Sequence, residues 1–466
     1  MNFSRAIDVV AEPDVLVVGA GSAGTAAALA AARHGASTVL IERCGFAGGY
    51  ISAVLGMSFD GMVDLRSGLP VVGGIVFEFI EHAGVYERQP PGLARPDPAT
   101  TRFAANSEIG QINETPDRAV IKIDVERFKL TADRLFRQAG VRVLYHTVAA
   151  DAIRKGDRVD SVVIANKGGL GLIRPKMVVD ASGDADVAAW AGAPYDLGLD
   201  VLQPMSLHFR IGNVQPDPDV KQQCFAAAQR AHADGKLPLF GGPWMNRWPS
   251  TDRDLMFNAT RVPGNPIDPD DLSGAEMQGR EDARVMFEYF KAHVPAFSDA
   301  YFVTSGPMVG VRESRRIRGD RTLSLADIEE SRAYDDVICM GNWWLDRHPK
   351  DRAGKHPLLL VRPYDIAHGT LLPQGLANVW VAGRCHSAEP EAQASSRVNV
   401  TCMGMGQAAG TAAAMAATGG HESRTLSVPA LQAALLADGG IILERARSTL
   451  KVGDALADRV AKVSMG

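Results

Sequence analysis

The chain has 466 residues, of which 46% are hydrophobic and 22% are charged, and its formal net charge is −5. This length and hydrophobic content allow a large core and more than one domain. The weakly negative charge gives no reason to expect a nucleic acid or an anionic membrane surface as a partner.

Five cysteines are scattered along the chain, and none belongs to a Cys-x-x-Cys pair. This spacing argues against a structural zinc site, a disulfide framework and a dithiol redox centre, and we expect no metal. Residues 15–32 are apolar enough to raise the question of a membrane span, but a glycine turn interrupts them, so a buried strand and helix explain them better. Acidic residues rather than a basic cluster precede this run, so no secretory signal is visible. We expect a soluble, cytoplasmic protein with reduced thiols.

The first predicted elements are a strand, a glycine turn and a helix in VLVVGAGSAGTAAALAAARHG, residues 15–35. In such a turn Gly19 permits the bend, Gly21 lets a pyrophosphate approach the backbone, and Gly24 lets helix and strand pack closely. A second strand, STVLIER, ends at Glu42, about 20 residues past the glycines, where a carboxylate binds a ribose hydroxyl. This order predicts a dinucleotide site for either FAD or NAD. The alternative is a glycine-rich unit that binds nothing.

A second glycine-dense stretch, RCGFAGGYISAVLGMSFDG, follows, and its glycines favour another close approach of backbone to ligand over an ordinary loop. Residues 89–113 are rich in proline and turn signals and predict a surface excursion. Residues 125–140 predict a helix, and residues 141–166 predict strands joined by a Gly-Asp turn. Next, PKMVVDASGDADVAAWAGAP predicts a second strand-to-helix turn, which contains Asp180 and Gly183.

The composition changes after these elements, because Trp, Pro and Met become frequent. The alternation in PMSLHFRIGNV predicts an antiparallel strand, and SGAEMQGREDARVMFEYFKAHV predicts a helix. Small residues return near the end, where NVWVAG predicts a strand, a long helix begins near Gly404, and Ser427 and Pro429 begin another. We therefore predict three parts: the first part of a nucleotide domain (1–194), an inserted substrate domain (195–361) and the rest of the nucleotide domain (362–466).

Three strand–turn–helix units rich in glycine and alanine lie near residues 19–24, 181–188 and 383–411. A nicotinamide enzyme needs one nucleotide domain that is usually contiguous, whereas a long cofactor threaded through the domain would use all three units. The start of the last helix would place the positive end of its dipole against the N1/O2 edge of a reduced flavin. The arrangement therefore favours FAD.

These motifs resemble those of the FAD-dependent oxidoreductases related to the fumarate reductase and glutathione reductase flavoproteins, and more narrowly a bacterial family of FAD-dependent oxidoreductases. The resemblance rests on the strand–turn–helix units above together with GVRESRRIRGD, PYDIAHGTLLPQGLANVWVAGRCHSA and SSRVNVTCMGMGQAAGTAAA, which occur in family order over nearly the full length. It implies an α/β fold in which a Rossmann-like FAD-binding domain of the glutathione reductase type carries an inserted α+β substrate domain.

The resemblance also implies which residues contact FAD, and Val148 among them would hold the adenine through its backbone. Cys44 departs from the family pattern, in which a hydrophobic residue and paired glycines follow the acidic strand end. We interpret Cys44 as a packed thiol rather than a flavin or substrate contact. The implied cofactor residues are Gly19, Gly21, Ser22, Ala23, Gly24, Glu42, Arg43, Gly48, Gly49, Val148, Ala181, Ser182, Gly183, Gly383, Arg384, Arg397, Gly406 and Gln407.

Because flavin itself accepts the hydride, the protein needs only groups that orient the substrate and manage one proton. Four histidines beside the motifs are candidates, although a lone histidine is more often structural. They are His208, His348, His368 and His386, of which His348 and His386 rank first.

The arginines of GVRESRRIRGD have two interpretations. Arg312 is kept as a ligand for a substrate carboxylate, whereas an internal ion-pair network is expected for Arg315, Arg316 and Arg318. Arg397 is the best candidate for contact with flavin or substrate. Tyr364 could donate a hydrogen bond or pack, and Trp343–Trp344 could line a substrate pocket or belong to the core.

The sequence thus predicts an FAD-dependent oxidoreductase, a dehydrogenase or an oxidase, that transfers a hydride between a small organic substrate and flavin N5. A histidine or tyrosine would handle the proton. The alternatives are a flavoprotein that catalyses a non-redox isomerisation or hydration, and a non-catalytic dinucleotide-binding module. The electron acceptor and the oligomeric state, a homo-oligomer included, stay open. A nicotinamide site is disfavoured, because no second glycine fingerprint stands out.

Overall fold

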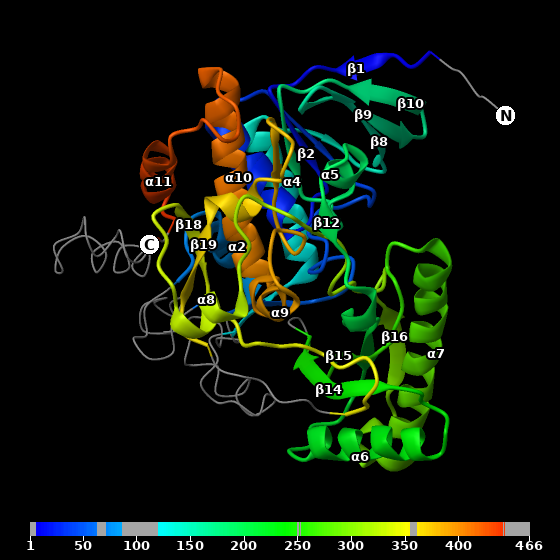
Figure 1. Cartoon of the computed structure of the whole chain (residues 1–466). Helices are drawn as coiled ribbons and strands as arrows, with labels where there is room; N and C mark the ends of the chain where they lie inside the picture. Colours follow the sequence, from blue (N-terminus) through cyan, green and yellow to red (C-terminus); the bar gives the residue numbers. More distant parts are fainter. Residues whose placement is uncertain are drawn as a thin grey trace, which may run out of the picture.

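The computed structural model describes residues 6–62, 71–85, 120–248, 251, 253–354, 361–440 and 442. The predicted excursion at 89–113 lies outside these residues. Figure 1 shows a parallel sheet with long helices beside it, a smaller antiparallel sheet above, and a further sheet with two helices at the lower right. Among the described residues, no helix combines the length and the apolar character that a membrane span requires.

The parallel sheet carries strands from both ends of the chain. All of its strands run in the same direction, and nearly all of their residues are buried, as expected for a sheet covered on both faces. Its strand order is β20 (Val379–Val381), β11 (Met177–Asp180), β2 (Val15–Val18), β3 (Thr38–Ile41) and β7 (Arg142–Leu144). The sheet therefore brings the predicted first, second and third turns to the same edge, where the strands end.

Two helices pack against each other beside this sheet: α1 (Ser22–Arg33) and α10 (Asn399–Gly419). A Cβ atom at Gly406 or Gly410 would lie 2.0 Å or 2.1 Å from a carbonyl oxygen of α1. Only glycine allows the two backbones to approach this closely. The small residues of the two helices therefore have a packing role wherever they do not face the pocket.

The sequence-based start of α10 near Gly404 is wrong, because the helix begins at Asn399. Val400 and Thr401, which are β-branched and intrinsically weak helix formers, lie in its buried first turn, where tertiary packing outweighs propensity. Gly406 and Gln407 consequently lie inside the helix rather than at a turn.

A second, mostly antiparallel sheet contains the predicted Gly-Asp hairpin. Gly156 turns the chain with φ +62°, and β8 begins at the residue assigned to adenine binding. Its order is β1 (Val9–Ala11), β10 (Gly169–Ile173), β9 (Arg158–Asn166) and β8 (Val148–Lys155).

A third, antiparallel sheet lies between the second and third cofactor motifs in the sequence. Its helices α6 (Val220–Ala233) and α7 (Pro269–His293) pack on it around a separate apolar core that includes Phe209, Phe257 and Phe290. The strand order is β14 (Phe240–Arg247), β15 (Leu255–Thr260), β13 (His208–Gly212) and β16 (Tyr301–Ser305).

The remaining elements belong to none of these three sheets. Strand β18 (Val337–Gly341) pairs antiparallel with β19 (Tyr364–Ala367) and packs against α10. The domain boundaries at 194/195 and 361/362 stay predictions. These elements are β4 (Ser58–Asp60), α2 (Ile75–Ala83), β5 (Gly84–Val85), β6 (Val120–Ile123), α4 (Val125–Ala139), α5 (Asp186–Trp190), β12 (Tyr195–Asp196), β17 (Arg316–Ile317), α8 (Leu325–Glu330), β18 (Val337–Gly341), β19 (Tyr364–Ala367), α9 (Pro390–Ser396) and α11 (Val428–Ala437).

Candidate active site

A pocket of about 430 Å³ lies where the three turns meet the antiparallel sheet that contains β13, β14 and β15. Its wall includes residues from the first turn, from the second turn and from the third. They are Gly19, Gly21, Ser22 and Ala23; Ala181, Ser182 and Gly183; and Gly383 and Arg384. Three segments far apart in the sequence therefore border one space.

The first turn exposes bare backbone to this pocket. Gly19 has φ +91°, and a Cβ there would lie 2.6 Å from the carbonyl oxygen of Ala181. A Cβ at Gly21, by contrast, would meet no atom within 4 Å, and Gly49 lies close beside it, since a Cβ on Gly49 would be 2.9 Å from the Gly21 Cα. Open space at a helix start next to a second glycine fits a pyrophosphate. Gly24 faces away and only packs, because its Cβ would lie 1.7 Å from the Gly19 oxygen.

Glu42 also lines the pocket, and it is 8% exposed. One carboxylate oxygen accepts a hydrogen bond from the Ala20 N–H and the other from the Cys44 N–H, each at 2.7 Å. An ionised carboxylate has about four acceptor positions, so roughly two stay available for ribose hydroxyls. Arg43 and Val148 border the same part of the pocket and are exposed.

The second and third turns are fixed by buried polar contacts. Asp180 accepts hydrogen bonds from the Ser182 hydroxyl at 2.6 Å and from the Ala188 N–H at 3.0 Å. Arg384 donates to Asp184 at 2.8 Å, and although burial acts in the opposite direction, this arginine and neighbouring hydrogen bonds keep the pKa of Asp184 below its ordinary value. Both turns are therefore held in place before any ligand binds.

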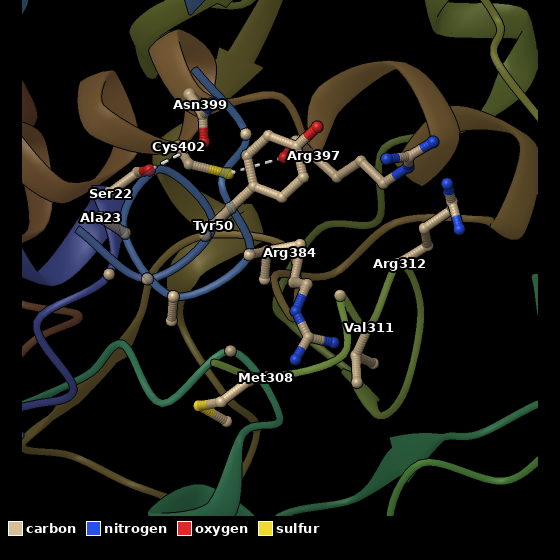
Figure 2. Close-up of a pocket in the computed structure, with 18 of the residues that line it drawn as sticks. Ser22, Ala23, Tyr50, Met308, Val311, Arg312, Arg384, Arg397, Asn399 and Cys402 are labelled. Carbon is tan, nitrogen blue, oxygen red and sulfur yellow. Dashed lines mark hydrogen bonds between the residues drawn. The ribbon is translucent and has the colours of Figure 1, made fainter. Parts of the chain in front are cut away.

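The starts of α1 and α10 converge at the pocket. The Ser22 hydroxyl donates to the side-chain oxygen of Asn399 at 2.9 Å, and the Asn399 amide donates to the Ser58 carbonyl at 3.0 Å. Asn399 and Cys402 line the pocket (Figure 2). The positive ends of two helix dipoles thus point toward the same cavity, and this favours a ligand with negative charge.

Three other residues assigned to the cofactor do not line the pocket. The Gly48 N–H donates to the Ala20 carbonyl at 2.7 Å, Gly406 packs on α1, and the Gln407 side chain accepts from the Ile75 N–H at 3.0 Å.

The opposite end of the pocket is polar and carries arginines and histidines. Figure 2 shows the Tyr50 ring in the middle of the pocket, with Arg312 and Arg397 to its right and Ser22 and Cys402 to its left. His208, His348, Asn258 and Asp346 complete this end. Four of the predicted catalytic residues therefore meet in one place: His208, His348, Arg312 and Arg397.

Arg312 is only 7% exposed, and its guanidinium donates to the Pro204 carbonyl at 2.6 Å and to Asn258 at 3.1 Å. No described residue places a carboxylate within ion-pair distance of it. Burial and the charges of Arg261 and Arg397 lower the pKa of Arg312 well below its ordinary value. An anionic ligand would therefore stabilise the charged form of this buried guanidinium.

Arg397 has a weak carboxylate partner. Its guanidinium donates to the backbone carbonyl of Asp346 at 3.0 Å, and the Asp346 carboxylate lies 3.7 Å away. Its Nε–H is buried and finds no partner in the described part of the chain. This guanidinium therefore has one hydrogen-bond donor that the described residues leave unsatisfied.

Both pocket histidines are neutral at physiological pH. Burial and the nearby Arg312 and Arg261 lower the pKa of His208 to about 3. Burial also lowers the pKa of His348 well below its ordinary value, although the Asp346 carboxylate, 3.4 Å away, opposes this. Neutral imidazoles beside arginines are weak bases and serve better as hydrogen-bonding groups.

The structure places the remaining histidines and Tyr364 away from the described pocket wall. His386 contacts Ser396 at 2.8 Å, His368 accepts from Trp380 at 3.0 Å, and the Tyr364 hydroxyl contacts Ser395 at 2.7 Å. Ion pairs form in the interior at Arg316–Glu313 and in a partly buried position at Arg315–Asp186, whereas the Arg318–Asp196 pair is exposed and so does not belong to an internal network. Of the pair Trp343–Trp344, Trp343 lines the pocket, and both residues are buried. Cys44 lines the pocket as well and contacts Met308, and burial and Glu42 raise its pKa to about 11, so the thiol is protonated.

The sequence did not single out Tyr50, Asn258, Arg261 or Asp346 as site residues. Arg261 lies behind the wall, where it donates to Asn258 at 3.0 Å and approaches His348 at 3.5 Å. A signal was available for Asn258, since it is an amide residue within the mostly apolar strand β15. For Tyr50 the sequence offered no indication of a role other than its position directly after Gly48 and Gly49.

Comparison with known proteins supports the cofactor assignment. Residues 14–435 match the model of a family described as FAD dependent oxidoreductase. The digeranylgeranylglycerophospholipid reductase of Picrophilus torridus is 28% identical over 180 residues, which are 38% of this chain and 41% of that protein. The protein with the same name from Thermoplasma acidophilum is 27% identical over 209 residues, 44% of this chain and 48% of that protein. The chain thus spans less than half the length of these curated relatives.

A solved structure of a geranylgeranyl bacteriochlorophyll reductase-like protein from Thermoplasma acidophilum is similar over 97% of this chain and 99% of that one, with 14% identity and a TM-score of 0.46. The family match covers most of the chain and agrees with the glycine turns and the bare backbone at Gly21. The chain belongs to the FAD dependent oxidoreductase family, and FAD is its cofactor.

Proposed function

We propose that the protein is an oxidoreductase that binds FAD along the three turns and acts on a small anionic substrate at the arginine-lined end of the pocket. The observation that carries this proposal is Arg312, a buried guanidinium in the pocket wall that forms no ion pair with a carboxylate of the described residues. A substrate carboxylate would supply the missing charge.

FAD, when bound, supplies two-electron chemistry by accepting or returning a hydride. Gly21 and Gly49 would face its pyrophosphate, and Glu42 would bind its ribose. The N-terminus of α10, at Asn399 and Cys402, would stabilise negative charge on the ring. These assignments account for the open backbone and for the converging helix starts.

The protein's own side chains then have three tasks. Arg312 and Arg397 would bind the anion and fix its orientation, and Arg261 would hold Asn258 and His348 in position from behind. His208 and His348, being neutral, would accept hydrogen bonds from the substrate or donate hydrogen bonds to it. Binding of an anion next to them would raise their pKa values, so that either could take a proton only in the complex.

The substrate named for the curated relatives is not carried over, because the matched region spans less than half of each of them. The electron acceptor and the oligomeric state are outside this proposal. All five cysteines are free thiols. On the basis of their scattered spacing we propose a cytoplasmic location.

The experiment is to mix the purified holoprotein anaerobically with carboxylic acids and with their methyl esters, and to follow the flavin absorbance. We expect an acid to bleach the flavin and its uncharged ester to leave it oxidised. Arg312→Lys, which keeps the charge but loses the planar fork, should weaken binding by about 10- to 150-fold, the equivalent of a charged hydrogen bond. Arg318→Gln, in an exposed ion pair, is the control. Equal reaction with acids and esters would contradict the proposal.

A further inference from the structure

We propose that the Tyr50 hydroxyl selects the substrate by donating a hydrogen bond to an oxygen that the substrate carries on the carbon beside its carboxylate. The substrate class is then a 2-hydroxy acid or the corresponding 2-oxo acid, rather than a plain carboxylic acid. This inference rests on the proposed function, which assigns the carboxylate to the arginines.

The Tyr50 hydroxyl is available to a ligand. The residue is 40% exposed, yet it lines the pocket, so its exposed surface faces the cavity (Figure 2). Among the residues that the structure describes, none forms a hydrogen bond with its hydroxyl oxygen. Tyrosine hydroxyls in enclosed positions usually have a partner, and a substrate atom would provide it here.

The hydroxyl is a donor rather than a base. Burial and the carboxylate of Asp60 raise the pKa of Tyr50 to about 12, although Arg312 and Arg397 act in the opposite direction. The phenol therefore keeps its proton at neutral pH. Arg312 and Arg397 line the same pocket as Tyr50, and Figure 2 shows both of them on one side of its ring, so a carboxylate bound to them would lie beside Tyr50.

The ring is held in position from two sides. A Cβ on Gly56 would lie 1.9 Å from the Tyr50 Cε1, so the glycine backbone packs directly on the ring, and the Gly56 N–H donates to the Tyr50 carbonyl at 2.9 Å. The ring of His208 stands edge-on, with centroids 5.6 Å apart and an interplanar angle of 83°. A donor fixed in this way loses little conformational entropy when the substrate binds.

The test compares matched pairs of acids that differ only in the 2-hydroxyl: lactate and propionate, mandelate and phenylacetate, phenyllactate and hydrocinnamate. Binding to the holoprotein is measured anaerobically in a stopped-flow instrument, from the perturbation of the flavin absorption spectrum directly after mixing and before any slower bleaching. In the wild type we expect the hydroxy acid of a pair to bind about 2- to 12-fold more tightly, the equivalent of one neutral hydrogen bond. Tyr50→Phe should bring this ratio to about 1 and leave the Kd of the plain acid unchanged.

Two further variants separate the hydroxyl from the fold. Gly56→Ala keeps the hydroxyl but displaces the ring, and it should lower the ratio as Tyr50→Phe does. Tyr289→Phe removes a hydroxyl that donates to Asp234 away from the pocket, and it should keep the wild-type ratio. Retained FAD and an unchanged circular dichroism spectrum show that each variant is folded.

The outcomes distinguish this inference from the proposed function. If Tyr50→Phe keeps the ratio, or weakens both acids of a pair equally, Tyr50 does not recognise the 2-substituent and the inference is overturned. Arg312→Lys should weaken both acids and leave the ratio intact, which tests the anion site by itself. If no acid binds the wild type, the proposed function fails and this inference fails with it.

Discussion

Gly21→Ala should weaken FAD binding without destabilising the apoprotein. A Cβ there would meet no atom within 4 Å, and the φ of −67° is open to any residue. The less flexible unfolded chain would even stabilise the apoprotein by about 0.4–1 kcal/mol. The new methyl would stand where the pyrophosphate is expected, and overpacking of this kind costs about 1–3 kcal/mol, or roughly 5- to 150-fold in Kd.

Gly24→Ala is the matched variant, because the same methyl would be added one helical turn away. Its Cβ would lie 1.7 Å from the Gly19 carbonyl oxygen and 3.2 Å from the Ala181 Cβ, so α1 must move away from the turn. Alanine gains about 1 kcal/mol of helix propensity, but the clash costs more, and we expect a net destabilisation of about 2 kcal/mol or more.

The assay has two parts, thermal unfolding of the FAD-free protein and titration of that protein with FAD, followed by flavin fluorescence. Melting temperatures are compared directly, because a chain with two cores need not unfold in one step. The reasoning is refuted if Gly21→Ala apoprotein binds FAD with the wild-type Kd, or if Gly24→Ala apoprotein melts at the wild-type temperature.

Three further predictions follow from the same geometry. Glu42→Gln should destabilise the apoprotein by about 1–3 kcal/mol and weaken FAD binding, because an amide cannot accept from both backbone N–H groups; thermal melts with and without FAD check this. Gly410→Ala should lower the melting temperature, since its Cβ would lie 2.1 Å from the Ala27 oxygen, whereas Gly274→Ala in the open part of α7 should raise it. The pKa of His208 is about 3 in the native state and 6.5 otherwise, so the unfolded state binds the additional proton. The free energy of unfolding should therefore fall as the pH decreases below about 6.5, by about 2 kcal/mol near pH 5, and His208→Gln should flatten that slope in pH-dependent unfolding.

The nucleotide-binding part was predictable because its signals are local. The strand, turn and helix around Gly19 follow from a short run of residues whose order and glycine spacing carry the chemistry. The expectation of an FAD-dependent oxidoreductase with an α/β fold is confirmed by the family match and by the parallel sheet. The start of α10 was missed because helix propensity favours the small residues after Gly404 over the β-branched ones before it.

The substrate end was harder to predict, because it exists only after distant segments meet. Three arginines on different segments of the chain come together here: Arg261, Arg312 and Arg397. The local sequence around each one indicates neither its burial nor its repulsion from the other two. The sequence could not separate the histidines that reach the pocket from those that do not. His208 and His348 line the pocket, whereas His386, which also lies beside a family motif, packs on α9.

The most direct measurement is a crystal structure of the protein with its FAD. We expect one FAD in this pocket, with the pyrophosphate at Gly21 and Gly49, a ribose at Glu42 and the isoalloxazine ring near Asn399. An FAD bound elsewhere, or with its pyrophosphate away from Gly21, would contradict this assignment of the pocket.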